Sequence, residues 1–324
     1  MKLIIQIPCF NEADTLPITL KDLPREVPGF SVVEWLIIND GSTDETEKIA
    51  RRCGIDHIVS FTNNQGLARA FLAGLDAAMK LGADIIVNTD ADNQYMAADI
   101  PALVAPILAG KADVVIGARP INKIGSFSPV KKILQKAGSA VVRFVSKTDI
   151  PDAPSGFRAM TREAAMRLNV FNDYTYTLET IIQAGQKNIA ITSVPIRVNG
   201  EIRPSRLVKS IPSYVRKSLV TIVRIFIVYK AFRFFMSVGL AVFGLGFLGG
   251  IRYLYFYATG DGAGHVQSLI LSSILLGVGF QTMLTAFLAD LLAVNRRLME
   301  DVQYRVKKLE YPETGDDPTA TQNG

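Results

Sequence analysis

Cysteine is scarce in this chain of 324 residues, and its two cysteines, Cys9 and Cys53, are too few for a disulfide framework or a zinc cluster. The first apolar run, residues 3–7, is too short for the core of a signal peptide and leads directly into the polar residues Asn11 and Glu12. We therefore expect reduced cysteines that serve as packing residues, and a soluble domain that stays in the cytoplasm.

The chain also lacks the charge pattern of a nucleic-acid-binding protein, although its formal net charge is +5. Its basic residues concentrate beside apolar runs, at residues 203–233 and 296–308. Clusters in such positions favour anionic lipid head groups and fix the orientation of membrane spans. We expect a lipid bilayer as a partner and no nucleic acid.

Up to about residue 198, apolar residues come in short bursts separated by polar loops. The pattern predicts strands at residues 3–7, 32–38, 57–61, 85–89 and 114–118, and helices at residues 13–23, 43–53, 67–81 and 100–108. Alternating strands and helices predict the α/β class, with a mainly parallel sheet that helices cover on both faces. Ligands of such sheets bind at the carboxyl ends of the strands.

Two apolar runs at residues 234–251 and 269–288 each have about the ~20 residues that cross a bilayer. The segment between them, residues 258–265, contains no Lys or Arg, whereas positive charge flanks the pair on its outer sides. This asymmetry predicts a transmembrane hairpin with both chain ends in the cytoplasm.

Glycines in the first apolar run match G-x-G-x-x-G at Gly244, Gly246 and Gly249, but they lie within an apolar helix and not after a strand. Gly246 and Gly250 also have the G-x-x-x-G spacing that lets helices approach closely. We interpret them as a packing surface, either within the hairpin or between copies of the chain, so that a homo-oligomer remains an open alternative.

Amphipathic patterns flank the predicted hairpin. Residues 205–229 place apolar and basic residues on different helix faces, which is typical of a helix at the membrane interface. Residues 295–309 predict a charged amphipathic helix before a disordered tail. The predicted domains are a soluble domain at 1–200, amphipathic juxtamembrane helices at 201–232, two transmembrane helices at 233–290, and a cytoplasmic C-terminal helix with its tail at 291–324.

One strand ends in D-A-D-N-Q, which contains Asp90, Asp92 and Gln94. Oxygen ligands at this period-two spacing can converge on one divalent cation. Two acidic residues after a strand are also typical of a solvated turn, so the motif depends on its context.

Two further loops carry polar side chains after predicted strands. In N-D-G-S-T-D, Ser42 or Thr43 suits a helix N-cap, and Asp40 before it remains available to a nucleobase or ribose. Gly66 precedes the next helix, where backbone N–H groups favour an anion, although a plain loop glycine is the alternative.

Five motifs, P-C-F-N-E, N-D-G-S-T-D, N-x-G-L-A-R-A, D-A-D-N-Q and D-A-P-S-G-F-R, follow the order and spacing of family 2 glycosyltransferases. More narrowly, the chain resembles the polyprenyl-phosphate glycosyltransferases, the group of dolichyl-phosphate mannose synthase and its bacterial undecaprenyl-phosphate relatives. The resemblance covers residues 1 to about 200 by motif and 200 to about 300 by layout. It implies a GT-A fold, a UDP- or GDP-linked sugar donor, Mg²⁺ or Mn²⁺, and a polyprenyl phosphate acceptor at the plasma membrane of a prokaryote.

The resemblance also implies a role for each matching residue. The residues expected to bind the nucleotide sugar are Pro8, Asn11, Glu12, Asp40, Gly66, Arg69, Asp90 and Ala91. The expected metal ligands are Asp90, Asp92 and Gln94, and the expected catalytic residues are Asp92, Arg119 and Asp152. Ser155, Arg158, Arg203 and Arg206 are expected to lie near the diphosphate and the acceptor phosphate.

Two positions depart from the family pattern. Leu67 stands where members often have lysine, so anion contact is expected from Arg69 or from the backbone. The segment G-E-I-R-P-S-R-L replaces the usual G-x-S-K, and Arg203 and Arg206 are expected to take over the role of that lysine.

The implied reaction is a single displacement with inversion at the sugar. A lipid phosphate with a second pKa of about 6 is largely ionised at neutral pH, so Asp152 is expected to orient or weakly assist and not to act as an obligatory base. A processive polysaccharide synthase would need more spans and a Q-x-x-R-W motif, neither of which we find. The other alternative is a non-catalytic, membrane-anchored protein that binds nucleotide sugar. The presence of all three expected metal ligands argues against it.

Overall fold

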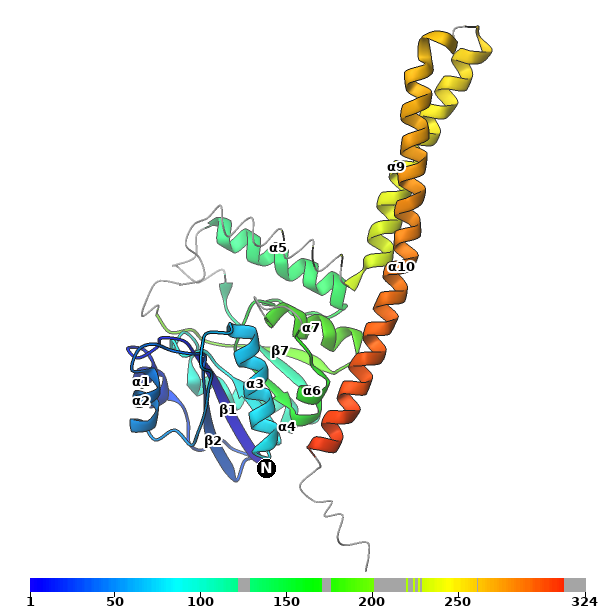
Figure 1. The fold of residues 1–324 in the computed structure, drawn as a ribbon. Coiled ribbons are helices and arrows are strands. Elements are labelled where there is room, and N and C mark those ends of the chain that lie inside the picture. Colours follow the sequence, from blue (N-terminus) through cyan, green and yellow to red (C-terminus); the bar gives the residue numbers. More distant parts are fainter. Residues whose placement is uncertain are drawn as a thin grey trace, which may run out of the picture. The chain divides into compact units, whose positions relative to one another are not determined.

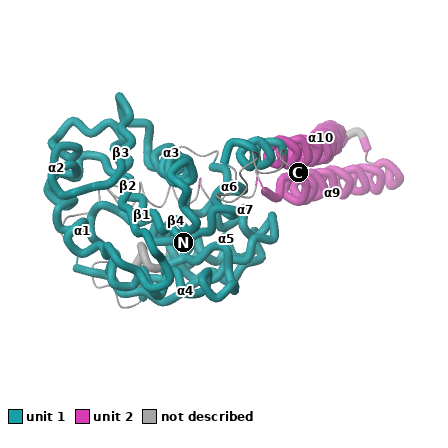
Figure 2. Tube along the Cα trace, turned by 90° about the horizontal axis from the view of Figure 1, so that it is seen from below, with its two compact units in different colours: residues 1–218, 302–324 teal, residues 219–301 magenta. Residues whose placement is uncertain are grey.

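The computed structural model describes residues 1–121, 129–170, 176–200, 220, 224, 227, 229–260 and 262–311. The chain forms two compact units (Figure 2). Unit 1 comprises Met1–Ser218 and Val302–Gly324, and unit 2 comprises Leu219–Asp301. Most of the amphipathic segment predicted at 205–229, and the tail predicted after Tyr311, lie outside the described residues.

Unit 1 is built on a seven-stranded sheet with the order β3-β2-β1-β4-β6-β5-β7 (Figure 1). The strands are β1 (Lys2–Cys9), β2 (Val32–Asn39), β3 (His57–Ser60), β4 (Ile85–Asn88), β5 (Val114–Ala118), β6 (Arg158–Thr161) and β7 (Ile191–Pro195). Strand β6 runs antiparallel to both of its neighbours, β4 and β5, whereas the other pairs are parallel. The predicted α/β class with a mainly parallel sheet is confirmed.

The helices of unit 1 are α1 (Leu16–Asp22), α2 (Thr46–Arg52), α3 (Leu67–Lys80), α4 (Ile100–Leu108), α5 (Pro129–Ser146), α6 (Arg162–Arg167) and α7 (Thr177–Gln186), with a 3₁₀ turn, η1, at Ala97–Asp99. All the predicted strands and helices are present, and α4 has the predicted bounds. Strands β6 and β7 and helices α5, α6 and α7 were not among the predicted elements. Strand β6 has only four residues, too few for a period of two to stand out.

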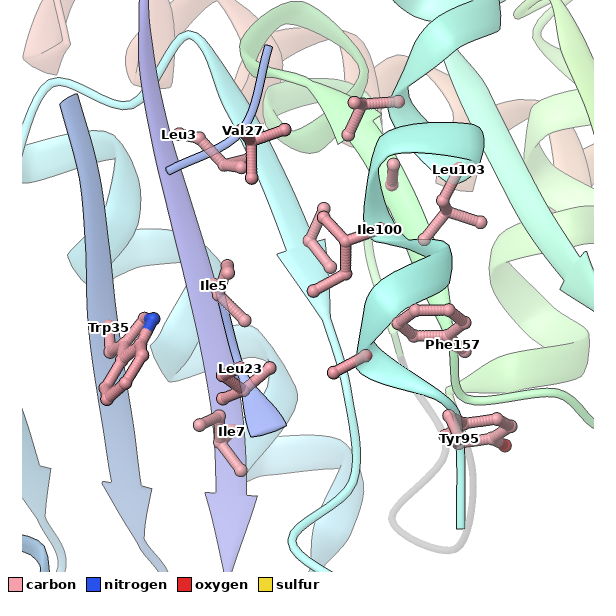
Figure 3. Close-up of a cluster of buried hydrophobic side chains, with 14 of the residues drawn as sticks. Leu3, Ile5, Ile7, Leu23, Val27, Trp35, Tyr95, Ile100, Leu103 and Phe157 are labelled. Atoms are coloured by element: carbon pink, nitrogen blue, oxygen red, sulfur yellow. The ribbon is translucent and has the colours of Figure 1, made fainter. Parts of the chain in front are cut away.

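Much of the core lies against β1, an interior strand of the sheet. Leu3, Ile5 and Ile7 of β1 are fully buried and belong to the same cluster as Ile100 and Leu103 of α4 (Figure 3). All residues of β1 after Lys2 are buried, on both faces of the sheet. A strand covered on both faces needs such a nearly continuous apolar run, which is why its sequence does not alternate.

Several loops meet at one edge of the sheet. Because β1, β2 and β4 run parallel, with Cys9 paired to Asn39 and Gln6 to Asn88, their carboxyl ends lie side by side. Strand β6 begins at the same edge, since Arg158 pairs with Asn88. The segments after β1, β2, β4 and β5 and the segment before β6 are therefore neighbours.

Unit 2 contains α9 (Ala231–Ala258), a 3₁₀ turn, η3 (Gly262–His265), and most of α10 (Val266–Glu310). By length and composition both helices could cross a membrane, with mean hydropathies of 2.0 and 1.7, and their apolar windows are only 11% and 17% buried. The helix predicted at residues 295–309 is the continuation of α10. The two long apolar helices of the predicted hairpin are present.

Small residues line the contact between α9 and α10. A Cβ atom added to Gly246 would lie 2.8 Å from the backbone nitrogen of Leu276, and one added to Gly279 would lie 2.5 Å from that of Phe243. Gly249 faces Ser272, whereas Gly244 and Gly250 have open space. Gly246, Gly249 and Gly279 therefore serve as packing surface within the hairpin, and Gly244 and Gly250 do not.

The last turns of α10 belong to unit 1 and contact its other helices. The Tyr304 hydroxyl donates to Glu163 of α6 at 2.6 Å, and the Tyr311 hydroxyl donates to Asp76 of α3. The Arg162 guanidinium donates to the Tyr311 carbonyl at 3.3 Å. These contacts attach the end of α10 to the domain that contains the sheet.

The turn after β2 lies directly against the loop after β3. Gly41 has a φ of +66°, and a Cβ atom there would lie 2.5 Å from the backbone nitrogen of Asn64. Gly54 also has a positive φ, +74°, but a Cβ atom there would have no neighbour within 4 Å. Both positions carry backbone strain, but only Gly41 would also have a steric clash. Substitutions at the two positions can therefore separate the two effects.

We expect Gly41→Ala to destabilise the protein by more than about 2 kcal/mol, because strain and a clash with immobile backbone add together. Gly54→Ala carries the strain alone and should cost about 1 kcal/mol. Thermal unfolding of the purified variants measures the difference. Equal losses of stability would show that the close approach of the two loops is not maintained in solution.

Candidate functional site

Asn11 joins the loops that follow β1 and β2. Its side-chain oxygen accepts hydrogen bonds from the Thr43 N–H at 2.8 Å and from the Thr43 hydroxyl at 3.3 Å, and its own N–H donates to Ser42 Oγ at 3.0 Å. Helix α2 starts only at Thr46, with Glu45 as its N-cap residue. The suggestion that Ser42 or Thr43 caps this helix is therefore wrong, because both side chains contact the Asn11 loop.

Asp40 organises the loop before α3. Its buried carboxylate accepts hydrogen bonds from the Gln65 N–H at 2.7 Å, the Gly66 N–H at 2.9 Å and the Asn64 amide at 3.0 Å. Glu12, also buried, accepts from the Thr15 hydroxyl at 2.7 Å. These carboxylates fix the loops at the sheet edge, and their contact with a nucleotide stays a prediction.

The D-A-D-N-Q loop after β4 is held from both sides. The Thr19 hydroxyl of α1 donates to the Ala91 carbonyl at 2.8 Å, and the Asn93 amide donates to Asp22 at 2.9 Å. The Asn199 amide donates to the Asn93 carbonyl at 2.9 Å. The loop is therefore fixed before any ligand binds.

Asp90 and Asp92 share a site of concentrated negative charge. Loss of solvent and the nearby Asp92 carboxylate raise the pKa of Asp90 to about 7, against the opposing effects of Arg119 and Arg158. A Cβ atom at Gly156 would lie 3.0 Å from one Asp90 oxygen, so the S-G-F-R segment packs against this carboxylate.

These residues fit a divalent cation that a substrate helps to hold. Among the residues that the structure describes, no three His, Cys, Asp or Glu side chains are grouped to hold a metal. Mg²⁺ is usually bound by only one or two carboxylates, together with substrate phosphates and water. A cation would also relieve the repulsion between Asp90 and Asp92 that raises the pKa of Asp90. The Gln94 backbone N–H donates to Asp92 at 3.1 Å, which orients that carboxylate.

Arg119 and Asp152 form a buried, bidentate ion pair. Arg119 Nε and Nη2 donate to the two Asp152 oxygens at 2.7 and 3.0 Å, and the Arg119 N–H donates at 3.1 Å. The side chains are only 7% and 1% exposed. Both Asp152 oxygens therefore accept hydrogen bonds from Arg119, and the expected orienting or weakly assisting role of Asp152 stays a prediction.

A cavity of about 450 Å³ lies beside this ion pair. Its lining residues are Arg119, Pro120, Ile121, Lys136, Arg143, Pro151 and Asp152. The lining contains three cationic side chains and one carboxylate, that of Asp152, which is already paired with Arg119. The cavity therefore has an excess of positive charge beside apolar side chains. Such a lining suits an amphipathic anion.

Arg158 and Ser155, which were expected near the phosphates, are both fully buried. The fully buried Arg158 donates to the Ser155 carbonyl and to the Thr180 hydroxyl, and burial lowers the pKa of its guanidinium. The buried Ser155 hydroxyl has no hydrogen-bond partner among the described atoms. Arg158 is placed to support the segment that carries Ser155, and a phosphate contact of either residue stays a prediction.

A network of uncharged groups supports the same segment. The Asn88 amide donates to the Gly156 carbonyl and to the Tyr176 hydroxyl, both at 2.9 Å, and the Gly156 N–H donates to the Tyr95 hydroxyl at 2.9 Å. Burial raises the pKa of Tyr95 to about 12, so it stays neutral. Sequence reasoning missed this network, although a lone asparagine that ends the apolar run of β4 was a usable signal.

The family is shown by comparison with known proteins. The family model described as "Glycosyl transferase family 2" matches residues 4–168, half of the chain. The chain belongs to glycosyltransferase family 2. The strands and loops described above, from β1 to β6, lie within the matched residues.

Relatives of this glycosyltransferase include enzymes named for lipid phosphates. The chain is 28% identical over 218 residues to the undecaprenyl-phosphate mannosyltransferase of Micrococcus luteus, covering 64% of this chain and 88% of the relative. It is 26% identical over 204 residues to the polyprenol monophosphomannose synthase of Mycolicibacterium smegmatis, covering 60% and 76%. An uncharacterised protein of Methanocaldococcus jannaschii is 30% identical over 204 residues, covering 60% and 81%.

Solved structures show the same fold. Glucosyl-3-phosphoglycerate synthase of Mycobacterium tuberculosis in complex with phosphoglyceric acid has a TM-score of 0.55 at 23% identity, covering 68% of this chain and 79% of that chain. The complex of that enzyme with Mn²⁺, UDP and glucosyl-3-phosphoglycerate has a TM-score of 0.53 at 20% identity, covering 70% and 78%. The predicted GT-A-like fold is confirmed.

The glycosyltransferase sheet edge brings most of the predicted site residues together. Pro8, Asn11, Glu12, Asp40, Gly66, Asp90, Ala91, Asp92, Gln94, Arg119, Asp152 and Ser155 lie at the ends of β1, β2, β4 and β5 or in the loops beside them. Arg69 lies in the first turn of α3, and Arg203 and Arg206 fall outside the described residues. Lys136 and Arg143 were missed, because helix α5 was not predicted.

The ion pair between Arg119 and Asp152 can be tested by a double-mutant cycle. Arg119→Met and Asp152→Leu each leave a buried charge without its partner, and each should cost about 3–5 kcal/mol. The double variant should be more stable than the sum of the two losses predicts, because neither charge remains. Thermal or urea unfolding measures the coupling, and additive losses would mean that the pair is not formed in solution.

Proposed function

We propose that this glycosyltransferase transfers a monosaccharide from a UDP- or GDP-linked donor to polyprenyl phosphate. The reaction is metal-dependent, inverts the configuration at the sugar and yields a polyprenyl-phosphate sugar. The proposal agrees with the names of the relatives from Micrococcus luteus and Mycolicibacterium smegmatis.

One observation carries the proposal. The Asp90 carboxylate of the D-A-D-N-Q loop lies close enough to Arg119 for their charges to interact, and Arg119 also lines the cavity with Lys136 and Arg143. A donor diphosphate needs a cation, which Asp90 and Asp92 would hold, whereas an acceptor phosphate needs cationic side chains. Arg119 takes part in both groups of residues, so donor and acceptor would meet beside it.

The chemistry needs little beyond this arrangement. An oxygen of the acceptor phosphate attacks the anomeric carbon as the bond between that carbon and the nucleotide diphosphate breaks. The phosphate has a second pKa of about 6, so no strong base is needed to remove a proton. Asp152 holds the Arg119 guanidinium in place, and Arg119 with Lys136 and Arg143 binds the attacking phosphate.

In the proposed site Asp90, Asp92 and Gln94 hold Mg²⁺ or Mn²⁺, which when bound stabilises negative charge on the leaving diphosphate. The residues proposed to line the nucleotide are Pro8, Asn11, Glu12, Asp40, Gly66, Arg69 and Ala91. Arg203 and Arg206 are proposed to add phosphate contacts. The solved relatives with UDP and Mn²⁺ or Mg²⁺ support a divalent cation in this fold.

A membrane location follows from the acceptor. Polyprenyl phosphate is confined to a bilayer, and α9 and α10 are long and apolar enough to place the chain there. We propose that the protein is integral to the plasma membrane of a prokaryote, with the sheet domain and both termini on the cytoplasmic side, where nucleotide sugars are made.

The transferase activity is tested with membranes that contain the protein, polyprenyl phosphate and radiolabelled nucleotide sugars. One donor should yield an organic-extractable, acid-labile product in the presence of Mn²⁺. Asp92→Asn should lower the rate by at least about 10²-fold, since it removes one of two carboxylates from the cation. Glu45→Gln changes an exposed carboxylate just before α2 and should leave the rate unchanged.

Two outcomes would contradict the proposal. If nucleotide sugar binds with metal but no donor yields a lipid product, the chain is a membrane-anchored binding protein. If Asp92→Asn retains full activity, the metal site is placed wrongly. A thermal-shift screen of UDP- and GDP-sugars with Mn²⁺ identifies the donor and confirms that the Asp92→Asn variant is folded.

The orientation is tested with the natural cysteines. Cys53 is exposed on the sheet domain and Cys9 is buried, so a membrane-impermeant maleimide should react with Cys53 alone. In intact bacterial spheroplasts we expect labelling only after the membrane is permeabilised, and Cys53→Ser should abolish it. Labelling before permeabilisation would place the sheet domain outside the cell.

A further inference from the structure

Tyr95 directly follows the D-A-D-N-Q loop and belongs to the buried core (Figure 3). It is only 3% exposed. Its backbone forms a β-bridge with Val198, and the Asn199 amide donates to its carbonyl at 3.4 Å. The side chain of Tyr95 therefore starts from a fixed point at the end of the loop that carries Asp90 and Asp92.

The Tyr95 hydroxyl holds one end of a peptide unit in the S-G-F-R segment. It accepts a hydrogen bond from the Gly156 N–H at 2.9 Å, while Arg158 donates to the Ser155 carbonyl of the same peptide unit. Both polar groups of this peptide are thus engaged by buried side chains. A peptide held in this way cannot rotate without leaving a buried polar group unpaired, which is costly. The position of Ser155 therefore depends on the Tyr95 hydroxyl.

The Tyr95 ring contacts two further parts of the site. It stacks on Phe157, with ring centroids 5.2 Å apart and an angle of 12° between the planes (Figure 3). The central carbon of the Arg119 guanidinium lies 6.0 Å from the Tyr95 ring centroid, at the limit of the range in which a ring face attracts a cation. Asp152 binds the same guanidinium. The ring thus adds to the contacts that hold Arg119 beside the cavity.

We propose that Tyr95 is a positioning residue for sugar transfer. It adjoins the loop that is proposed to hold the cation, and through Gly156 and Arg119 it fixes the residues proposed to bind the acceptor phosphate. One side chain thereby sets the placement of the acceptor side relative to the donor side. The inference rests on the proposed function. Because Tyr95 is buried and its hydroxyl is already bonded, it acts through its neighbours and not on a substrate.

The D-A-D-N-Q loop itself is held without the Tyr95 side chain. The Thr19 hydroxyl donates to the Ala91 carbonyl at 2.8 Å. The Asn93 amide donates to Asp22 at 2.9 Å. A substitution at Tyr95 leaves both contacts in place, so we expect binding of the cation and the nucleotide to survive it. Only the placement of the acceptor side should change.

A purely structural role is the alternative, because a buried tyrosine also stabilises the core. The two roles predict different kinetics. A structural role lowers the number of folded molecules and leaves the turnover of each folded molecule unchanged. A positioning role lowers kcat of the folded molecules and leaves the KM for the donor unchanged.

The test variant is Tyr95→Phe, which keeps the ring and removes the hydroxyl. It is assayed as full-length protein in nanodiscs that contain polyprenyl phosphate, with rates expressed per nucleotide-binding site so that unfolded molecules do not count. We expect kcat to fall by about 10- to 10²-fold while the KM for the donor changes by less than about twofold, because a small misplacement of reacting groups is enough for such a loss.

The matched control is Tyr311→Phe. It also removes a buried, hydrogen-bonded tyrosine hydroxyl, but at the end of α10, and it should leave kcat unchanged. Tyr95→Leu removes the ring as well as the hydroxyl and should lower kcat further than Tyr95→Phe. Equal kcat values for these two variants would remove Arg119 from the proposal.

Hydrogen–deuterium exchange tests the contact without any substrate. In Tyr95→Phe the Gly156 amide should exchange at least about 10-fold faster than in the unmodified protein, since it loses its buried acceptor. The amides of β1 should exchange at the same rate in both proteins. Mass spectrometry with fragmentation to single amides measures the difference, and an unchanged rate at Gly156 would overturn the proposal.

Two kinetic outcomes would also overturn it. The first is an unchanged kcat per nucleotide-binding site in Tyr95→Phe. The second is loss of nucleotide binding in that variant, because the side chain would then hold the fold or the metal loop and not the acceptor side alone. Failure of the unmodified protein to form any lipid product contradicts the proposed function instead, so the two failures are distinguishable.

Discussion

Two carboxylates, Asp90 and Asp92, lie close together after β4, and the rest of the site is arranged around their charge. Loss of solvent and mutual repulsion raise the pKa of Asp90, while Arg119 and Arg158 oppose that rise. Burying like charges is costly unless opposite charge is near. The site therefore keeps two arginines close by, and it is suited to a ligand that brings a cation with it.

Antiparallel strand β6 makes this arrangement possible. Inserted between β4 and β5, it begins at the edge where both neighbours end, so the segment at Ser155 and Gly156 lies against Asp90. A parallel strand in the same place would send that segment to the opposite edge of the sheet. The buried network of Asn88 and Tyr95 then fixes the segment through hydrogen bonds to Gly156.

The two long apolar helices follow a simpler physical rule. Helices α9 and α10 leave most of their apolar surface exposed, and glycines such as Gly246 bring the two backbones close together. The end of α10 changes character: Tyr304 and Tyr311 make hydrogen bonds to α6 and α3 of the sheet domain. Helix α10 thus has an apolar surface along most of its length and makes polar contacts at its end.

Sequence patterns were sufficient where the signal is local. The period of the apolar residues predicted five strands and four helices, and the loops that follow the strands contain most of the candidate site. Patterns could not find the short strand β6. They also could not show that Arg158, which was expected to lie near a phosphate, is fully buried. They also missed α5, whose Lys136 and Arg143 line the cavity from a helix with no motif of its own.

The sequence by itself determined five strands and four helices of the sheet domain, the two long apolar helices and the identity of the loops at the carboxyl edge, because periodicity and turn chemistry act between near neighbours in the chain. Only the tertiary structure decided the partners of each charge. Asp152 is paired with Arg119, and Asp40 with the loop before α3, because side chains distant in sequence meet only when the strands are ordered in the sheet. Desolvation and charge pairing depend on that order, and no local pattern contains it.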